Sequence, residues 1–184
     1  EGNTIGIIST FENEKREQIF LTPFSEFNVS WPNKNIISLL TKPSASQNGF
    51  LYALNPTTKS FKKVVGNIKG LTAGFSPNGE KIIFTETKKN NFSTLIYDSK
   101  LNGTSSFGVT TFPEKCVWSN VLSNIVYCAV PKNIPSAEYP DEWYQGLISF
   151  TDSIWRIDLI NGATEEIYAT DFDIINPFLS TNED

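Results

Sequence analysis

The chain of 184 residues contains no histidine and no methionine, and only two cysteines. Without histidine, neither a Ser-His-Asp triad nor a Cys-His pair can form, and no imidazole is available as a metal ligand or general base. The chain also lacks a Gly-x-Ser-x-Gly elbow, a phosphate-binding glycine loop, a Cys-x-x-Cys pair and calcium-loop spacing. The sequence therefore predicts a protein that is not an enzyme and that uses no cofactor or metal.

Acidic side chains are the remaining candidates for chemistry. Asp141 stands beside Glu142, and Asp171 stands close to Asp173. Two carboxyl groups can in principle perform acid–base or glycoside chemistry. Neighbouring acids in an acidic loop are usually only solvated, however, so we assign no catalytic residue to this chain.

Long apolar runs and basic clusters are also missing. No stretch approaches the roughly 20 apolar residues of a membrane span, and no signal sequence is present. The formal net charge is −5, and the only basic doublets, Lys62-Lys63 and Lys88-Lys89, lie beside turn residues. Tight nucleic-acid binding needs a clustered basic face. We expect no nucleic-acid partner and no membrane insertion by this segment, and any anchor of the full-length protein lies elsewhere.

Aromatic-led segments recur along the chain at nearly constant spacing. They occupy residues 29–33, 74–78, 117–120 and 177–182. Trp31, Phe75 and Trp118 stand about 40–45 residues apart, and each unit contains several short apolar strands. The last interval is longer by about the length of one insertion, residues 131–150. This period predicts an all-β fold, a β-propeller.

Each repeat has the content of one propeller blade. An apolar strand follows the aromatic residue, a third strand comes next, and a turn leads into a fourth. Two of these turns are Asn-Gly, which favours a type I′ hairpin with two positive φ angles. We expect one domain over residues 1–184. Its four-stranded antiparallel blades are expected at about 29–70, 73–112 and 116–170.

The chain ends are out of phase with the blades. Ile7 to Thr10 precedes Trp31 as Tyr52 precedes Phe75, so the chain begins at a third strand. Residues 177–182 align with a first strand, which leaves partial blades at both ends. A second strand is missing for ring closure, so the chain resembles a piece of a larger ring more than a four-bladed ring. We expect Trp31, Phe75 and Trp118 to be buried at equivalent positions on the innermost strands.

The repeat resembles a known family. The pattern aromatic-Ser-Pro/Asn-Asn-Gly-x-x-Ile, a strand ending in Leu-Tyr or Ile-Trp, and Asp-x-x-x-Asn-Gly resembles the TolB-type and WD-like propeller repeats of bacterial envelope proteins. Residues 74–103 match best. The repeats are also similar to the non-catalytic propeller of prolyl-oligopeptidase and dipeptidyl-peptidase relatives. The Gly-His and Trp-Asp dipeptides of WD repeats in the strict sense are absent. The motif is structural, so it implies a fold and, by analogy only, an extracytoplasmic location.

The two cysteines flank the first hairpin of the third blade. If Trp118 pairs with Val126 across the hairpin, the antiparallel register also pairs Cys116 with Cys128. Their Cα atoms then lie within the distance of a disulfide. Transfer of the register from the second blade instead puts the two thiols on opposite faces. A disulfide would indicate an oxidising compartment. Two small buried thiols are the alternative.

The insertion at 131–150 is the best candidate for a ligand site. Three prolines stiffen it, and its rings and acids suit a protein or carbohydrate ligand. The connection between the second and third strands lies on the face that commonly carries the binding site of propellers. The candidate ligand-binding residues are Tyr139, Asp141, Glu142, Trp143 and Tyr144, and we expect the three rings to stand at the tip of the insertion, where they contact the ligand. Alternatively, the insertion folds back over its own blade or shields a ring edge.

These observations predict a non-catalytic, extracytoplasmic binding or scaffold module that recognises a protein or carbohydrate through the face bearing the insertion. The alternative is an accessory propeller that gates a prolyl-oligopeptidase-like hydrolase domain outside this chain. A carbohydrate enzyme based on two acids comes third. The domain order of the full-length protein discriminates between the first two.

Overall fold

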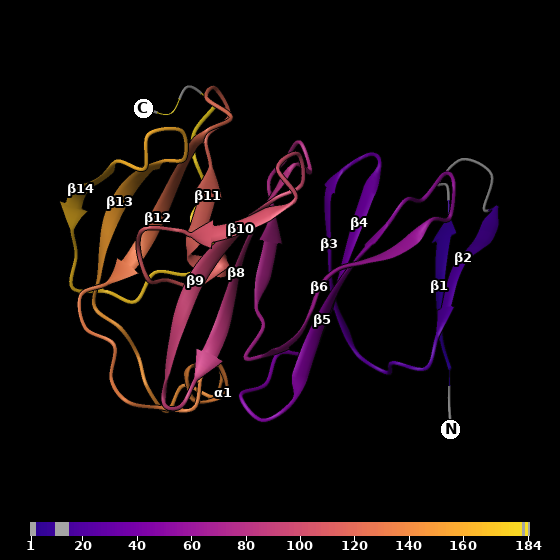
Figure 1. The fold of residues 1–184 in the computed structure, drawn as a ribbon, viewed down its shortest axis with the longest axis horizontal. Coiled ribbons are helices and arrows are strands. Elements are labelled where there is room, and N and C mark those ends of the chain that lie inside the picture. Colours follow the sequence, from indigo (N-terminus) through magenta and orange to yellow (C-terminus); the bar gives the residue numbers. More distant parts are fainter. Residues whose placement is uncertain (1–2, 10–14, 182, 184) are drawn as a thin grey trace.

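The computed structural model describes residues 3–9, 15–181 and 183. Three four-stranded antiparallel sheets and one two-stranded sheet stand side by side in chain order (Figure 1). The N-terminal and C-terminal ends lie at opposite sides of this row, and the described sheets do not close into a ring. Within each four-stranded sheet the strands follow the order of the chain, as in a propeller blade.

The strands have the following bounds. The N-terminal hairpin consists of β1 (Thr4–Ser9) and β2 (Arg16–Thr22). The first blade contains β3 (Phe27–Asn33), β4 (Ile36–Thr41), β5 (Asn48–Leu54) and β6 (Phe61–Lys69). The second contains β7 (Ala73–Phe75), β8 (Lys81–Lys88), β9 (Asn91–Asp98) and β10 (Gly103–Ser106). The third contains β11 (Cys116–Trp118), β12 (Ile125–Pro131), β13 (Asp152–Asp158) and β14 (Thr164–Ala169).

Helical structure is short in the described part of the chain. A 3₁₀ turn, η1 (Pro113–Lys115), precedes β11, and the helix α1 (Asp141–Tyr144) lies within the insertion. No helix of the described residues is long and apolar enough to cross a membrane.

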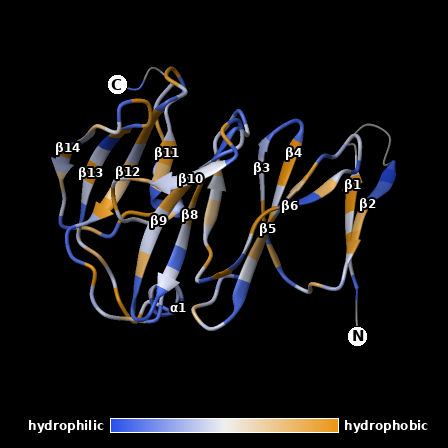
Figure 2. Ribbon diagram, viewed as in Figure 1, coloured by the Kyte–Doolittle hydropathy of each residue, from blue (hydrophilic) through white to orange (hydrophobic). Residues whose placement is uncertain are grey.

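The cores lie between blades because neighbouring sheets pack face to face. One cluster joins Leu40 and Leu51 of the first blade to Ile82 and Phe84 of the second. The next joins Ile83, Ile96 and Phe107 of the second blade to Val126, Cys128 and Ile157 of the third. All side chains of the second strands β4 and β12 are buried or partly buried, and most of them are apolar (Figure 2).

The repeat places its aromatic residues on equivalent strands, but the expected burial of Trp31 is wrong. Trp31, Phe75 and Trp118 lie on the first strands β3, β7 and β11. Phe75 and Trp118 are partly buried because each packs against the cluster that it shares with the preceding blade. Trp31 is 55% exposed. It faces a hairpin of only two strands, β1 and β2, which is too narrow to cover it.

The turns differ in detail from the type I′ prediction. Asn102, with a φ of 49°, and Gly162, with a φ of 73°, are the positive-φ residues of the two Asn-Gly turns. A type I′ turn needs two such residues. The Asp98 carboxylate accepts hydrogen bonds from the Lys100 and Leu101 amides, at 2.9 and 3.1 Å, and this Asx turn lengthens the connection.

The C-terminal segment does not form the predicted opening strand. Residues 177–180 have no strand structure, since no described segment pairs with them in a ladder. Instead the Glu183 carboxylate accepts hydrogen bonds from the Ser119 hydroxyl, at 2.8 Å, and from the Asn120 amide. The C-terminal end is thereby held against the loop between β11 and β12.

Cys116 and Cys128 form a disulfide between β11 and β12, with Cα atoms 4.1 Å apart. Trp118 pairs with Val126, which puts the two cysteines directly opposite each other. The register of the second blade, where Phe75 pairs with Ile82, does not transfer.

We expect the Cys116→Ala/Cys128→Ala double variant to lose about 3 kcal/mol of unfolding free energy, because the disulfide restricts the unfolded chain. Urea denaturation of the variant and the wild type, both without reductant, measures the difference. Thiol counting on the denatured wild type is the control. Two titratable thiols in unreduced protein would contradict the disulfide.

Candidate binding cavity on the insertion face

Three loops of equivalent position form one face of the molecule. Each connects the second strand of a blade to its third, so blade repetition places them together at the lower edge of Figure 1. In the first two blades the connection is short. In the third it is the insertion, which carries α1. The loops comprise residues 42–47, 89–90 and 132–151.

The insertion of the third blade contacts both of the other two blades. The Ala137 amide donates a hydrogen bond to the Asn90 carbonyl, at 3.1 Å, on the β8–β9 turn. The Ala45 amide of the β4–β5 loop donates one to the Asp141 carboxylate. Gly70, at a φ of 63°, approaches so closely that a Cβ there would lie 2.8 Å from the Tyr139 carbonyl oxygen. The insertion is therefore a fixed bridge across the three blades.

Two of the predicted ligand-binding rings lie inside this bridge. Tyr139 is 0% exposed and Trp143 is 9% exposed. Trp143 stacks on Phe112 with ring centroids 4.6 Å apart, and the Tyr139 hydroxyl donates to the Pro135 carbonyl at 2.6 Å. Burial, followed by the negative charge of Glu142, raises the pKa of Tyr139 to about 12.

The expectation that both rings stand exposed at the tip of the insertion is wrong. Phe92 on β9 and Phe112 before η1 offer an apolar surface that the insertion covers. The alternative prediction is that the insertion folds back over its own blade. These two rings do fold back, but the surface that they cover includes Phe92 of the second blade. The complete cluster contains Phe92, Phe112, Ala137, Tyr139, Trp143 and Phe150.

The two predicted acids are engaged with the backbone. The Asp141 carboxylate accepts the Ala45 amide, and the Glu142 carboxylate accepts the Glu138 amide at 3.0 Å. These hydrogen bonds fix the loop and the start of α1. Neither carboxylate lines the cavity described next, so their role as ligand contacts stays a prediction without support from this geometry.

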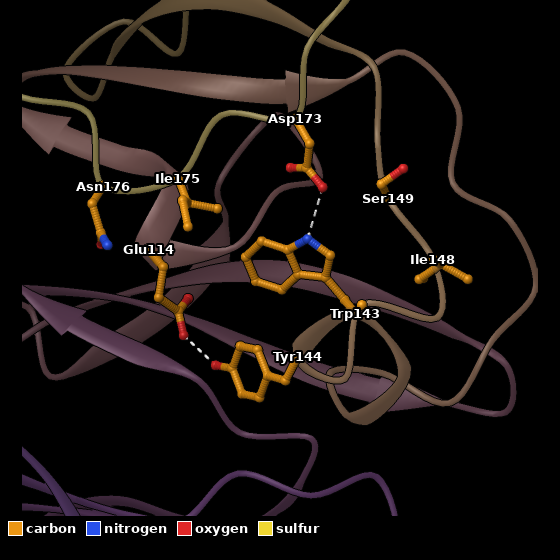
Figure 3. Close-up of a pocket in the computed structure, with 9 residues that line it drawn as sticks. Glu114, Trp143, Tyr144, Ile148, Ser149, Asp173, Ile175 and Asn176 are labelled. Carbon is orange, nitrogen blue, oxygen red and sulfur yellow. Dashed lines mark hydrogen bonds between the residues drawn. The ribbon is translucent and has the colours of Figure 1, made fainter.

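A cavity of about 450 Å³ opens between the insertion, η1 and the C-terminal segment (Figure 3). Trp143 and Tyr144 are the two predicted residues that line it. Trp143 is 9% exposed, whereas Tyr144 is 45% exposed. The full lining comprises Glu114, Trp143, Tyr144, Gly146, Ile148, Ser149, Asp173, Ile175 and Asn176.

A buried ammonium group holds one wall of the cavity. Lys115 is 0% exposed, and its Nζ donates to the Asp152 carboxylate at 2.7 Å, to the Asp173 carboxylate and to the Ile174 carbonyl at 2.9 Å. The same Nζ lies 5.2 Å from the ring centroids of Trp143 and Phe150. One side chain thus connects η1, β13, the insertion and the C-terminal segment.

Asp173 links this ion pair to the cavity. Its Oδ2 accepts hydrogen bonds from the Trp143 indole and the Phe150 amide, both at 3.0 Å (Figure 3). Burial acts to raise the pKa of Asp173. The hydrogen bonds from Lys115, Phe150 and Trp143 outweigh burial and hold the pKa of this carboxyl below its ordinary value. Asp173 is therefore ionised and fixed in place at neutral pH.

Glu114 is the least satisfied group in the cavity wall. Its Oε1 accepts a hydrogen bond from the Tyr144 hydroxyl (Figure 3), while its Oε2 is buried and has no partner among the described residues. Burial raises the pKa of Glu114, and this effect outweighs the opposing interactions with the Tyr144 hydroxyl, its own backbone amide, the Thr72 hydroxyl and the charge of Lys115. Burial, together with the charge of Glu114, also raises the pKa of the Tyr144 hydroxyl. Burial thus disfavours the charged form of Glu114.

We expect Glu114→Gln to stabilise the protein by about 1–3 kcal/mol at pH values above the folded pKa of Glu114, because it removes a poorly paired buried charge and keeps an oxygen for Tyr144. The folded pKa of Glu114 lies above the unfolded value. Its stabilising contribution is therefore complete below the unfolded pKa and is lost as pH rises through the folded pKa.

Melting temperatures at about pH 4 and about pH 8 measure this effect. Glu165→Gln, at an exposed position on β14, is the control. The effect on stability is expected only at the higher pH and only for Glu114→Gln. An equal change at both pH values would contradict an ionised Glu114.

Sequence reasoning missed Glu114 and Asp173, which line the cavity, and Lys115, which lies behind its wall. One signal was present: Pro113 to Lys115 immediately precedes the first strand of the third blade, on the face already chosen for the insertion. The pairing of Lys115 with Asp152 and Asp173, which are 37 and 58 residues away, has no local signature.

No family model and no curated protein matches the chain. Solved structures do match. TolB from Acinetobacter baumannii is 14% identical, with a TM-score of 0.58 over 88% of this chain and 37% of its own. The uncharacterized protein lmo1340 from Listeria monocytogenes EGD-e is 21% identical, with a TM-score of 0.62 over 92% of this chain and 48% of its own.

A third match is the β-propeller domain of the Trilobed protease from Pyrococcus furiosus, with 13% identity and a TM-score of 0.54. It covers 89% of this chain and 48% of its own. The fold is a TolB-like β-propeller. This chain thus spans less than half the length of these three propeller structures, and identities this low establish the fold alone.

Proposed function

We propose that this TolB-like propeller is a non-catalytic binding module that takes a ligand in the cavity on the insertion face. The observation that carries the proposal is the built wall of that cavity. The insertion breaks the blade period, yet it is fixed by buried contacts and, with Asp173 and Lys115, shapes a hollow of about 450 Å³. A pre-formed hollow with apolar walls and a few placed polar groups is the usual form of a ligand site.

The comparisons support a propeller module without catalysis of its own. TolB and the propeller domain of a protease share the fold. In the described residues, no cluster of three or more histidine, cysteine or acidic side chains is arranged to hold a metal. Two acids line the cavity, and one of them, Asp173, is engaged by Lys115, the Trp143 indole and the Phe150 amide, so the two are not placed as a free pair of catalytic carboxyl groups.

The proposal includes an extracytoplasmic location. The Cys116–Cys128 disulfide supports it, because such bonds persist mainly in oxidising compartments. Thiol labelling in intact source cells, before and after reduction, tests the location. Labelling without reductant would place the protein in a reducing compartment and overturn this part of the proposal.

A cavity-filling variant tests the binding role. Ile175 lines the cavity and is exposed, so Ile175→Trp is expected to obstruct it without disturbing the core. Val121→Trp, at an exposed position on the β11–β12 loop, is the matched control. Peptides from a random library and glycans from an array are scored for binding to wild type. Ligands are expected that bind wild type and Val121→Trp but not Ile175→Trp. Equal binding by all three proteins, or no ligand at all, would refute the proposal.

A second candidate is an accessory propeller of a peptidase, and the match to the propeller domain of the Trilobed protease favours it. This candidate requires a hydrolase domain in the full-length protein. The complete coding sequence decides the question. A hydrolase domain in it would favour the accessory role, whereas an apolar anchor without such a domain would favour the binding module.

A further inference from the structure

We propose that the cavity binds a cationic group, namely the ammonium or guanidinium end of a lysine or arginine side chain carried by a partner polypeptide, beside Glu114. This inference rests on the proposed binding function and specifies its ligand class. It is carried by the charge balance of the cavity, the incompletely hydrogen-bonded carboxylate of Glu114 and the exposure of the Tyr144 ring.

The cavity wall is acidic without a matching base. Glu114 and Asp173 line it, and the lining contains no lysine or arginine. Lys115 lies just behind the wall, but its ammonium group already donates hydrogen bonds to Asp152, Asp173 and the Ile174 carbonyl. An ammonium group has three N–H donors, so Lys115 has none left for Glu114.

The nearby buried groups therefore carry excess negative charge. Asp152 and Asp173 share the single positive charge of Lys115, and Glu114 adds a further acid. Two carboxylate oxygens in this region, Oε2 of Glu114 and Oδ1 of Asp152, are buried without a hydrogen-bond partner among the described residues. Buried oxygens of this kind are costly unless a donor or a cation reaches them. Of the two residues, Glu114 is the one that lines the cavity.

The remaining lining suits the stem and head of a basic side chain. Ile148 and Ile175 provide apolar contacts for methylene groups, which lysine and arginine bury while their charged ends reach a polar partner. The half-exposed ring of Tyr144 lies beside Glu114 and offers a face to a cation. The same wall already holds one ammonium group against aromatic rings, that of Lys115.

A carbohydrate fits this lining less well than a cation. Sugar rings bind by stacking on an open aromatic face, and Trp143 has its face against Phe112, at an interplanar angle of 6°. Only 9% of Trp143 is exposed. Tyr144 is then the one lining ring on which a sugar could stack, and its hydroxyl already donates a hydrogen bond to Glu114.

Titration calorimetry with short capped peptides tests the inference. The probes are acetyl-Gly-Lys-Gly-amide and acetyl-Gly-Arg-Gly-amide, with acetyl-Gly-Gln-Gly-amide as the neutral analogue and putrescine as a free amine. We expect the two cationic peptides to bind wild type more tightly than the neutral one. Glu114→Gln should weaken that binding by about 30-fold or more, as for the loss of one partner of a buried charge pair. Glu165→Gln, at an exposed position on β14 and outside the cavity lining, is the matched control and should bind like wild type.

Each other outcome overturns a definite part of the account. Equal binding of neutral and cationic peptides that Ile175→Trp abolishes would refute the cation and leave the proposed function standing. Cation binding that Glu114→Gln does not weaken would refute the role of Glu114. Putrescine binding as tight as that of the lysine peptide, with the same dependence on Glu114, would replace the partner polypeptide by a free amine. No cationic probe bound by wild type, while library ligands still bind through the cavity, would refute the cation alone.

Discussion

Lys115→Met is expected to lower the free energy of unfolding by about 3–5 kcal/mol, because it leaves buried carboxylates without their cation. Asp152 is fully buried and Asp173 is partly buried, and both accept hydrogen bonds from the same ammonium group. Methionine preserves the length of the side chain, so lost packing contributes little. Urea denaturation monitored by tryptophan fluorescence measures the change.

Lys100→Met provides the matched control for this loss. Lys100 pairs with Glu80 at 2.8 Å, but its side chain is 69% exposed. Exposed ion pairs contribute about 0–1 kcal/mol, so this variant should stay close to wild type. If Lys115→Met were no less stable than Lys100→Met, the buried network would not hold the cavity wall.

Trp143→Ala is expected to destabilise the protein by about 3–5 kcal/mol, the usual loss for a large buried aromatic side chain. The ring stacks on Phe112 and donates to Asp173, so its removal leaves a void and an unpaired acceptor. Thermal denaturation measures the loss. Phe172→Ala, at an exposed ring near the same segment, is the control and should change little.

An unchanged melting temperature for Trp143→Ala would contradict the structure. Such a result would support the prediction from the sequence alone, namely that the ring stands exposed at the tip of the insertion. The same variant would then keep the fold and lose only ligand contacts.

Much of the fold was predictable because a propeller repeats one unit. The spacing of Trp31, Phe75 and Trp118 located the first strand of each blade. Pairing Trp118 with Val126 was enough to place Cys116 opposite Cys128. Such contacts are local, within one hairpin, so pattern and register determine them.

Burial of single rings was less predictable, since it depends on what the neighbouring blade supplies. Trp31 and Phe75 hold equivalent positions, yet Phe75 has a full sheet before it and Trp31 has only a hairpin. Tyr139 and Trp143 are amphipathic and suit either a ligand or a core. Phe92 and Phe112, which decide the matter, lie far away in the sequence.

The cavity was the least predictable feature. Its wall joins η1, α1 and the segment at 173–176, three pieces that come together only in the fold. The insertion was chosen from the sequence because it breaks the period, and Trp143 and Tyr144 do line the cavity. Glu114 carries no sequence signal, since an acid before a strand is ordinary until its burial is known.

The most direct test of the account is an NMR measurement of where a lysine side chain binds. Wild-type protein is mixed with acetyl-Gly-Lys-Gly-amide, and nuclear Overhauser contacts are recorded from the lysine methylenes. We expect contacts to the Tyr144 ring and to the methyl groups of Ile148 and Ile175 in wild type, and we expect these contacts to be lost in Glu114→Gln. Contacts to rings outside this cavity, or contacts that persist unchanged in Glu114→Gln, would contradict the account.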